Sequence, residues 1–156
     1  MSRSRIVALV LTLASSALLV SACAKPFPGV SVWAGTNSIH LEAQCWSDNP
    51  AISLNTSSCA KVLSAAQAAK EIPTLKVVPG ATMGISVDAK VAKNGWVAKL
   101  GSNNLTPKTL HTTYWRFTWP QLSSLATTNQ LIVLASGPTS TTYRGIWVYS
   151  TVSNGN

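Results

Sequence analysis

The sequence predicts a single, mainly β domain, and three features of the 156-residue chain support this. Apolar and polar residues alternate over short stretches such as residues 39–45 and 112–119, as in strands that are buried on one face. Turn-forming pairs such as Pro79-Gly80 and Asn94-Gly95 separate these stretches. The length suits one hydrophobic core. About seven short strands at this spacing predict an antiparallel β-sandwich of the immunoglobulin-like kind.

The first 22 residues have the features of an export signal. Arg3 and Arg5 precede residues 6–20, which are apolar or small and uncharged and too few to span a bilayer comfortably. The stretch ends in Val20-Ser21-Ala22-Cys23, which resembles the lipobox of bacterial lipoproteins. That resemblance implies cleavage before Cys23 and attachment of a diacylglycerol to its sulfur. A secretory signal cut near Ala22 or Ala24 and an uncleaved anchor are the alternatives.

A short tether follows the lipidated cysteine. Residues 23–29 include Pro26 and Pro28, and their extended reach is about 20 Å, so the sequence predicts a domain held close to the membrane. The β-sandwich is expected over residues 30–150. Residues 151–156, rich in Ser, Thr and Asn, are expected to form a flexible tail.

Cys45 and Cys59 are the two cysteines that remain once Cys23 carries lipid. An even pair in an exported chain predicts a disulfide between them. A metal site is the rival use, but His40 and His111 are the only histidines and no closely spaced cysteine pair is present, so we expect neither a metal nor another cofactor. Residues 60–72, rich in alanine and preceded by Ser57 and Ser58, predict one short helix after Cys59.

The order of these features resembles a family of small actinobacterial lipoproteins known as a domain of unknown function. The resemblance rests on the lipobox, the tether, the cysteine pair, the Val78-Pro79-Gly80 turn, and the Val-Asp-Ala-Lys-Val-Ala run at residues 87–92 with Trp96 after it. It covers roughly residues 23–96. It implies an envelope lipoprotein with a β-sandwich and supplies no catalytic residues.

Charge and residue content narrow the function. The net charge is +8, but the basic residues lie singly, so the sequence does not predict binding to nucleic acid. The charge suits anionic lipid head groups or other envelope polyanions, or serves solubility alone. Only four acids are present, and no nucleophile elbow occurs. His40 and Glu42 could contribute to a small hydrolase with a distant serine, but their place on the polar side of a strand favours an exposed contact.

Binding is the better functional hypothesis. Six tryptophans are many for this length, and about two-thirds are expected in the core. Trp46, on the polar face of its strand beside turn residues, is the one expected at a binding surface. The sequence therefore predicts a non-enzymatic, lipid-anchored module on the extracytoplasmic face of a membrane, with an envelope protein or glycan as partner. A structural lipoprotein without a ligand is the alternative.

Overall fold

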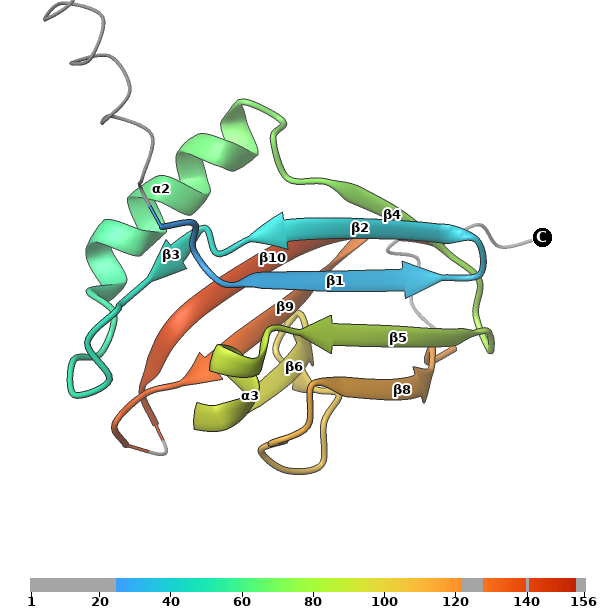
Figure 1. The fold of residues 1–156 in the computed structure, drawn as a ribbon. Coiled ribbons are helices and arrows are strands. Elements are labelled where there is room, and N and C mark those ends of the chain that lie inside the picture. Colours follow the sequence, from blue (N-terminus) through green and yellow to red (C-terminus); the bar gives the residue numbers. More distant parts are fainter. Residues whose placement is uncertain (1–24, 122–127, 140, 154–156) are drawn as a thin grey trace, which may run out of the picture.

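The computed structural model describes residues 25–121, 128–139 and 141–153, and these form two β-sheets that pack face to face (Figure 1). The predicted signal peptide and Cys23 lie outside the described residues. The first sheet has four antiparallel strands in the order β2-β1-β5-β8. Their bounds are Gly29–Ala34 for β1, Asn37–Glu42 for β2, Thr82–Val87 for β5 and Tyr114–Thr118 for β8.

The second sheet has six strands and is built around the long strand β10. Its path is β3-β10-β9-β6-β7, and β4 pairs with the same edge of β10 as β3 does. The bounds are Cys45–Trp46 (β3), Thr74–Val77 (β4), Trp96–Leu100 (β6), Asn103–Asn104 (β7), Thr128–Ser136 (β9) and Tyr143–Ser153 (β10). The predicted mainly β fold is confirmed. One detail differs, because β4 runs parallel to β10 rather than antiparallel.

The core lies between the two sheets and is dominated by large rings. Trp96, Trp119, Trp147 and Tyr149 are fully buried, and Trp115 packs against their cluster. The polar atoms of two rings join the sheets: the Tyr149 hydroxyl donates to the carbonyl of Val30 at 2.7 Å, and the Trp147 indole donates to the carbonyl of Pro28 at 3.1 Å. Burial also raises the pKa of Tyr149, which stays neutral as a donor.

The stretch expected to be one strand over residues 39–45 is divided between the sheets. Strand β2 ends at Glu42, and the next residues cross over, with the Ala43 amide donating to Pro28 and the Gln44 amide donating to Ile146. The alternation survives the crossing, since Ala43 and Cys45 are both buried. Alternation with a period of two indicates which face of a strand a residue occupies, but it does not indicate which sheet the strand joins.

Two helices are present among the described residues, whereas the sequence predicted one. Helix α2, Thr56–Ala68, begins before Cys59 because Asn55 caps it and accepts from the Ser58 amide at 3.0 Å. Cys59 therefore lies in its first turns rather than ahead of it. Helix α3, Ala89–Asn94, was not predicted; it occupies most of the run that carried the family resemblance and buries Val91 and Ala92.

Both ends of the domain extend beyond the predicted bounds. Pro28 and Gly29 belong to the domain rather than to the tether: both are buried, and the Gly29 amide donates to Asp88 at 2.7 Å. At the other end the predicted flexible tail is wrong for residues 151–153, which complete β10. Thr151 is buried there, and its hydroxyl donates to the carbonyl of Asn129 at 3.0 Å. Small polar residues read as a tail in the sequence, but pairing with β4 and β9 satisfies their backbone.

Candidate functional site

Helix α2 lies beside β3 at one side of the sandwich (Figure 1) and is fastened there by the disulfide between Cys45 and Cys59. The predicted pairing is confirmed, with the two Cα atoms 5.8 Å apart. Few of the backbone positions of α2 come close to any strand. Only Cys59 is buried among its described side chains, and Leu63 and Ala66 are half-buried. The helix is therefore attached firmly at its start and stands away from the sheet over much of its length.

The end of α2 has a distinctive backbone geometry. The Glu71 amide donates to the carbonyl of Ala66 and the Lys70 amide to that of Gln67, which is the pattern of a Schellman motif. Lys70 occupies the left-handed position of this motif with φ of 58°, and it is the only non-glycine residue of the described chain with positive φ. Glycine is the usual residue there because it lacks a Cβ. A lysine at this position carries strain that a glycine would avoid.

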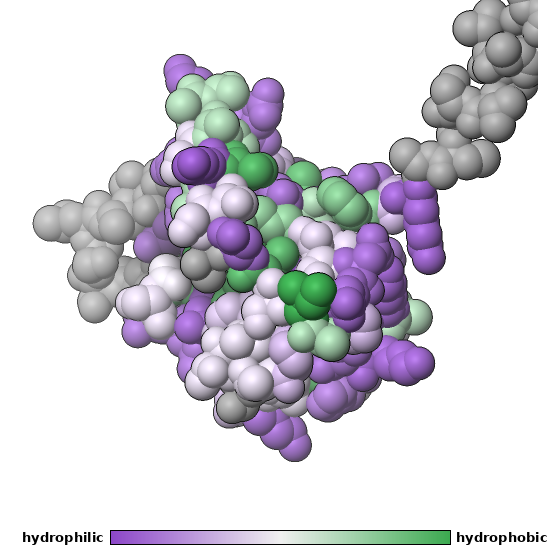
Figure 2. Space-filling model, turned by 90° about the vertical axis from the view of Figure 1, so that its left-hand side faces the viewer, coloured by the Kyte–Doolittle hydropathy of each residue, from purple (hydrophilic) through white to green (hydrophobic). Residues whose placement is uncertain are grey.

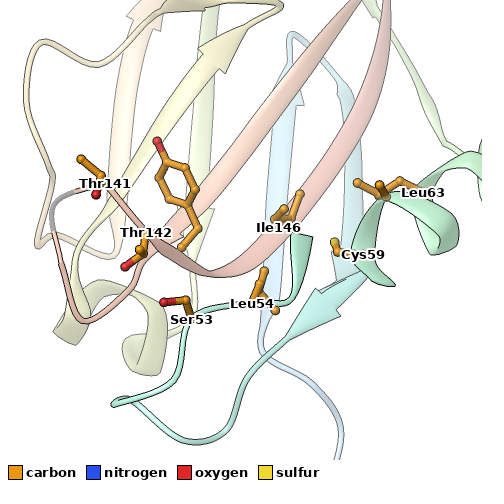
Figure 3. Close-up of a pocket in the computed structure, with 9 residues that line it drawn as sticks. Ser53, Leu54, Cys59, Leu63, Thr141, Thr142 and Ile146 are labelled. Carbon is orange, nitrogen blue, oxygen red and sulfur yellow. The ribbon is translucent and has the colours of Figure 1, made fainter. Parts of the chain in front are cut away.

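Between α2 and the outer face of the second sheet runs a trench, which we name the α2 trench. One part has a volume of about 300 Å³ and is drawn in Figure 3, where Leu54, Cys59, Leu63 and Ile146 lie together and Ser53 and Thr142 lie at one end. The neighbouring part, of about 430 Å³, shares Ala60, Leu63, Tyr143 and Ile146 with the first. The shared lining places the two parts next to each other along α2.

Outward-facing residues of the two central strands form the floor of the trench. These are Ile132 and Leu134 from β9 with Ile146 and Val148 from β10. The run from Leu131 to Ala135 was visible in the sequence as continuously apolar, and such a run indicates a strand with both faces covered. One face is the core and the other is the trench. This signal could have pointed to the site, although only the structure shows that α2 covers the second face incompletely.

The opposite end of the trench is polar. A third hollow of about 510 Å³ shares Gln67, Ile72 and Gln130 with the apolar part and adds Lys70, Thr74, Asn129 and Ser150. Among the described residues that line the three parts, Lys70 is the only charged one, and none is a histidine or a carboxylate. On the side of the molecule that carries α2, Figure 2 shows apolar side chains exposed between polar ones. The trench thus has an apolar body and one cationic end.

Trp46, the residue predicted at a binding surface, is half-buried and already engaged. Arg144 and Lys90 lie over its ring, with the guanidinium carbon 4.5 Å and the ammonium 5.1 Å from the centroid. Its indole donates to Asp48 at 3.1 Å, and the ring covers Gly145, where an added Cβ would meet it at 2.6 Å. The ring therefore joins β3, β10 and α3, and the two cations reduce the surface on which a sugar could stack.

The charges around Trp46 hold one another in place. Lys90 forms an ion pair with Asp48 at 2.6 Å, and hydrogen bonds from Lys90 and from the indole lower the pKa of Asp48. Arg144 is buried and donates to the carbonyls of Ser47 and Asp48 at 2.8 and 3.2 Å, while its Nε has no protein partner. Burial lowers the pKa of Arg144, and the nearby Asp48 opposes this. The cluster fixes the loop after β3 to the sheet.

The candidate hydrolase residues are only partly brought together. His40 Nδ1 lies 2.9 Å from the hydroxyl of Ser31 on the outer face of the first sheet, so a serine does meet the histidine. Both lie outside the lining of the three hollows described above. Within the described ranges, no group of three or more His, Cys, Asp and Glu side chains is arranged to hold a metal. No helix of that same part of the chain is long and apolar enough to cross a membrane.

The α2 trench and the Trp46 cluster are the two features from which a function must be argued. Comparison with protein-family models and with curated protein sequences finds no match to this chain. The resemblance to actinobacterial lipoproteins therefore stays a prediction, as does the immunoglobulin-like form of the sandwich.

Proposed function

We propose that this chain is an exported, lipid-anchored and non-enzymatic binding module of the cell envelope, and that the α2 trench holds the hydrocarbon part of an amphiphilic ligand. The trench is the observation that carries the proposal. It is a concave apolar groove with a few polar groups at one end, and its parts have volumes in the range of small-molecule sites. Its lining, as far as the chain is described, contains no histidine or carboxylate side chain, and this favours binding over acid–base catalysis.

The location rests on the sequence alone. The signal over residues 1–22, expected to be helical, and the lipobox cysteine predict an acyl anchor on Cys23, and the confirmed disulfide suits an oxidising compartment. Since the ordered domain starts at Pro28, the tether from Cys23 is short and keeps the trench near the membrane, where amphiphiles are concentrated. The Cys23→Ala protein is expected to leave the membrane fraction after a salt wash. Membrane retention equal to wild type would contradict the anchor.

A ring placed in the trench tests the binding site. Ala60 is exposed on α2 and lines both apolar parts, so Ala60→Trp should fill the groove at little cost to the fold. Ala65→Trp is the matched control, because Ala65 is exposed on the same helix and is absent from the lining of the three hollows. The probe is N-phenyl-1-naphthylamine, a neutral apolar fluorophore. If the new ring displaces apolar contact between the fluorophore and the trench equal to two buried methylene groups, the affinity for the fluorophore falls about tenfold.

We expect saturable binding of the fluorophore to wild type and to Ala65→Trp, and binding about tenfold weaker in Ala60→Trp. Circular dichroism checks that both variants are folded. Wild-type protein that shows no saturable binding, or equal binding by both variants, would remove the trench as a ligand site. The domain would then fit the alternative of a structural lipoprotein without a ligand.

A further inference from the structure

We infer that the ligand of the α2 trench is a single-chain amphiphile with an anionic head group, bound with the head at Lys70 and the chain directed toward Tyr143. This inference rests on the proposed function and adds the class, the charge and the orientation of the ligand. Three properties of the trench support it: the distribution of charge, the length and the width.

Charge is confined to one end of the trench. Lys70 is the only charged residue in the described lining, and around it lie amide and hydroxyl groups that suit a polar head: Gln67, Gln130, Thr74 and Ser150. Lys76, two residues beyond Thr74 on the outward side of β4, is absent from the lining and does not contribute to its charge. Glu71 follows Lys70 in the chain but is absent from the lining of the trench. The local charge therefore complements a head group of negative charge.

The length of the apolar part matches one acyl chain. The apolar floor follows β10 from Val148 to Tyr143, which is about 16 Å at about 3.3 Å per residue. The hydrocarbon core of a bilayer is about 30 Å thick, so a chain that fills one leaflet extends about 15 Å. Such a chain would lie over Val148 and Ile146 and end near Leu54, while its head remained at Lys70.

The width limits the ligand to one chain. The apolar floor is contributed by two strands, β9 and β10, whose spacing is about 4.8 Å, and a single helix forms the wall. Leu63 extends from that wall over the groove and lines both apolar parts. A floor of two strands suits one chain better than two chains side by side.

The backbone of Lys70 adds an independent observation. Its left-handed conformation is strained for a residue with a Cβ, and glycine would relieve that strain. Strain of this kind is often kept where a side chain is needed for function. Under this inference, the side chain needed at this position is a cation at the polar end of the trench, which glycine would not supply.

The test compares two ligands with the same acyl chain, laurate and glycerol monolaurate, each used as monomers to displace N-phenyl-1-naphthylamine. Laurate is an anion and the monoglyceride is neutral. Wild type should bind laurate about two- to fivefold more tightly, which is the gain from one exposed ion pair. Lys70→Gln should remove this preference. The matched control Lys61→Gln, which removes the same charge from an exposed position of α2 outside the trench, should keep it.

The outcomes separate this inference from the proposed function. If Lys70→Gln and Lys61→Gln change the preference equally, overall charge is responsible and the inference about the head group is overturned. The proposed function would still hold if glycerol monolaurate binds to wild type and Ala60→Trp blocks this binding. If neither ligand displaces the fluorophore, the proposed function fails as well. Vesicles of phosphatidylglycerol without free laurate form the third arm. Binding to these vesicles but not to either monomer would mean attraction to a membrane surface and would overturn the inference.

Discussion

The disulfide between Cys45 and Cys59 should decide whether α2, and with it one wall of the trench, stays in place. We consider the double variant Cys45→Ala/Cys59→Ala, which removes the link and leaves both positions apolar. The cysteines are 14 residues apart, and closing a loop of this size restricts the unfolded chain by about 3 kcal/mol. The question is whether the remaining contacts of α2 are strong enough to replace this constraint.

The structure indicates that they are weak. Apart from Cys59, the least exposed of the described side chains of α2 are Leu63 and Ala66, and both are only half-buried. Full burial of a leucine contributes about 1.5–3 kcal/mol, so partial burial contributes about 1 kcal/mol. A helix of 13 residues is marginal in water by itself. Without the disulfide, α2 should therefore open locally while the two sheets remain folded.

Hydrogen exchange measured by mass spectrometry tests this directly. A loss of 3 kcal/mol corresponds to about a 100-fold fall in protection, and we expect a fall of up to about this size in residues 56–71. Peptides from β9 and β10 should keep wild-type protection, and fluorophore binding should be lost. Wild type treated with a reducing agent provides the chemical control. If α2 stayed as protected in the double variant as in wild type, packing would hold the helix and the reasoning would be refuted.

Three further predictions test other parts of the structure. Trp115 stacks on Phe117 and packs against the core, so Trp115→Ala should lower the free energy of unfolding by about 3 kcal/mol in denaturant melts. Arg116 is exposed on the other side of the same strand, and Arg116→Ala should change this free energy by less than about 0.5 kcal/mol. Equal effects of the two variants would mean that the core face of β8 is misassigned. Asp48 has a lowered pKa because Lys90 donates to it, so its contribution to stability is present above the ordinary aspartate pKa and is lost as the pH falls through the lowered value. In Asp48→Asn, the free energy of unfolding should lack this loss on acidification. The same dependence of stability on pH in the variant and in wild type would contradict the prediction. Lys70→Gly should leave the protein equally stable or up to about 1 kcal/mol more stable while removing the preference for laurate, and a less stable variant would contradict the strain argument.

The arrangement of the core could be predicted from the sequence because alternation is a local property. Strand β8 and the residue after it place Trp115, Phe117 and Trp119 toward the core, and β8 places Tyr114 and Arg116 outward, as the period of two requires. The disulfide was equally accessible, because a pair of cysteines in an exported chain needs little further information.

The sequence also carried a trace of the trench. The apolar run at residues 131–135 is typical of a strand that is covered on both faces. It did not indicate what covers the outer face. The outer face is covered by α2, which begins before Cys59. The disulfide from Cys59 to Cys45 holds the start of this helix against β3, and the direction of the helix from that point is visible only in the fold.

Only the tertiary structure decided the features on which function depends. The crossing between sheets at Ala43, the parallel pairing of β4, and the cations over Trp46 each join segments far apart in the chain. Local periodicity determines which side of a strand an atom faces, because it follows from backbone geometry. Which distant segment meets that face depends on packing of the whole chain, and so the sequence predicted a β-sandwich with a disulfide while the structure alone showed a trench with one charged end.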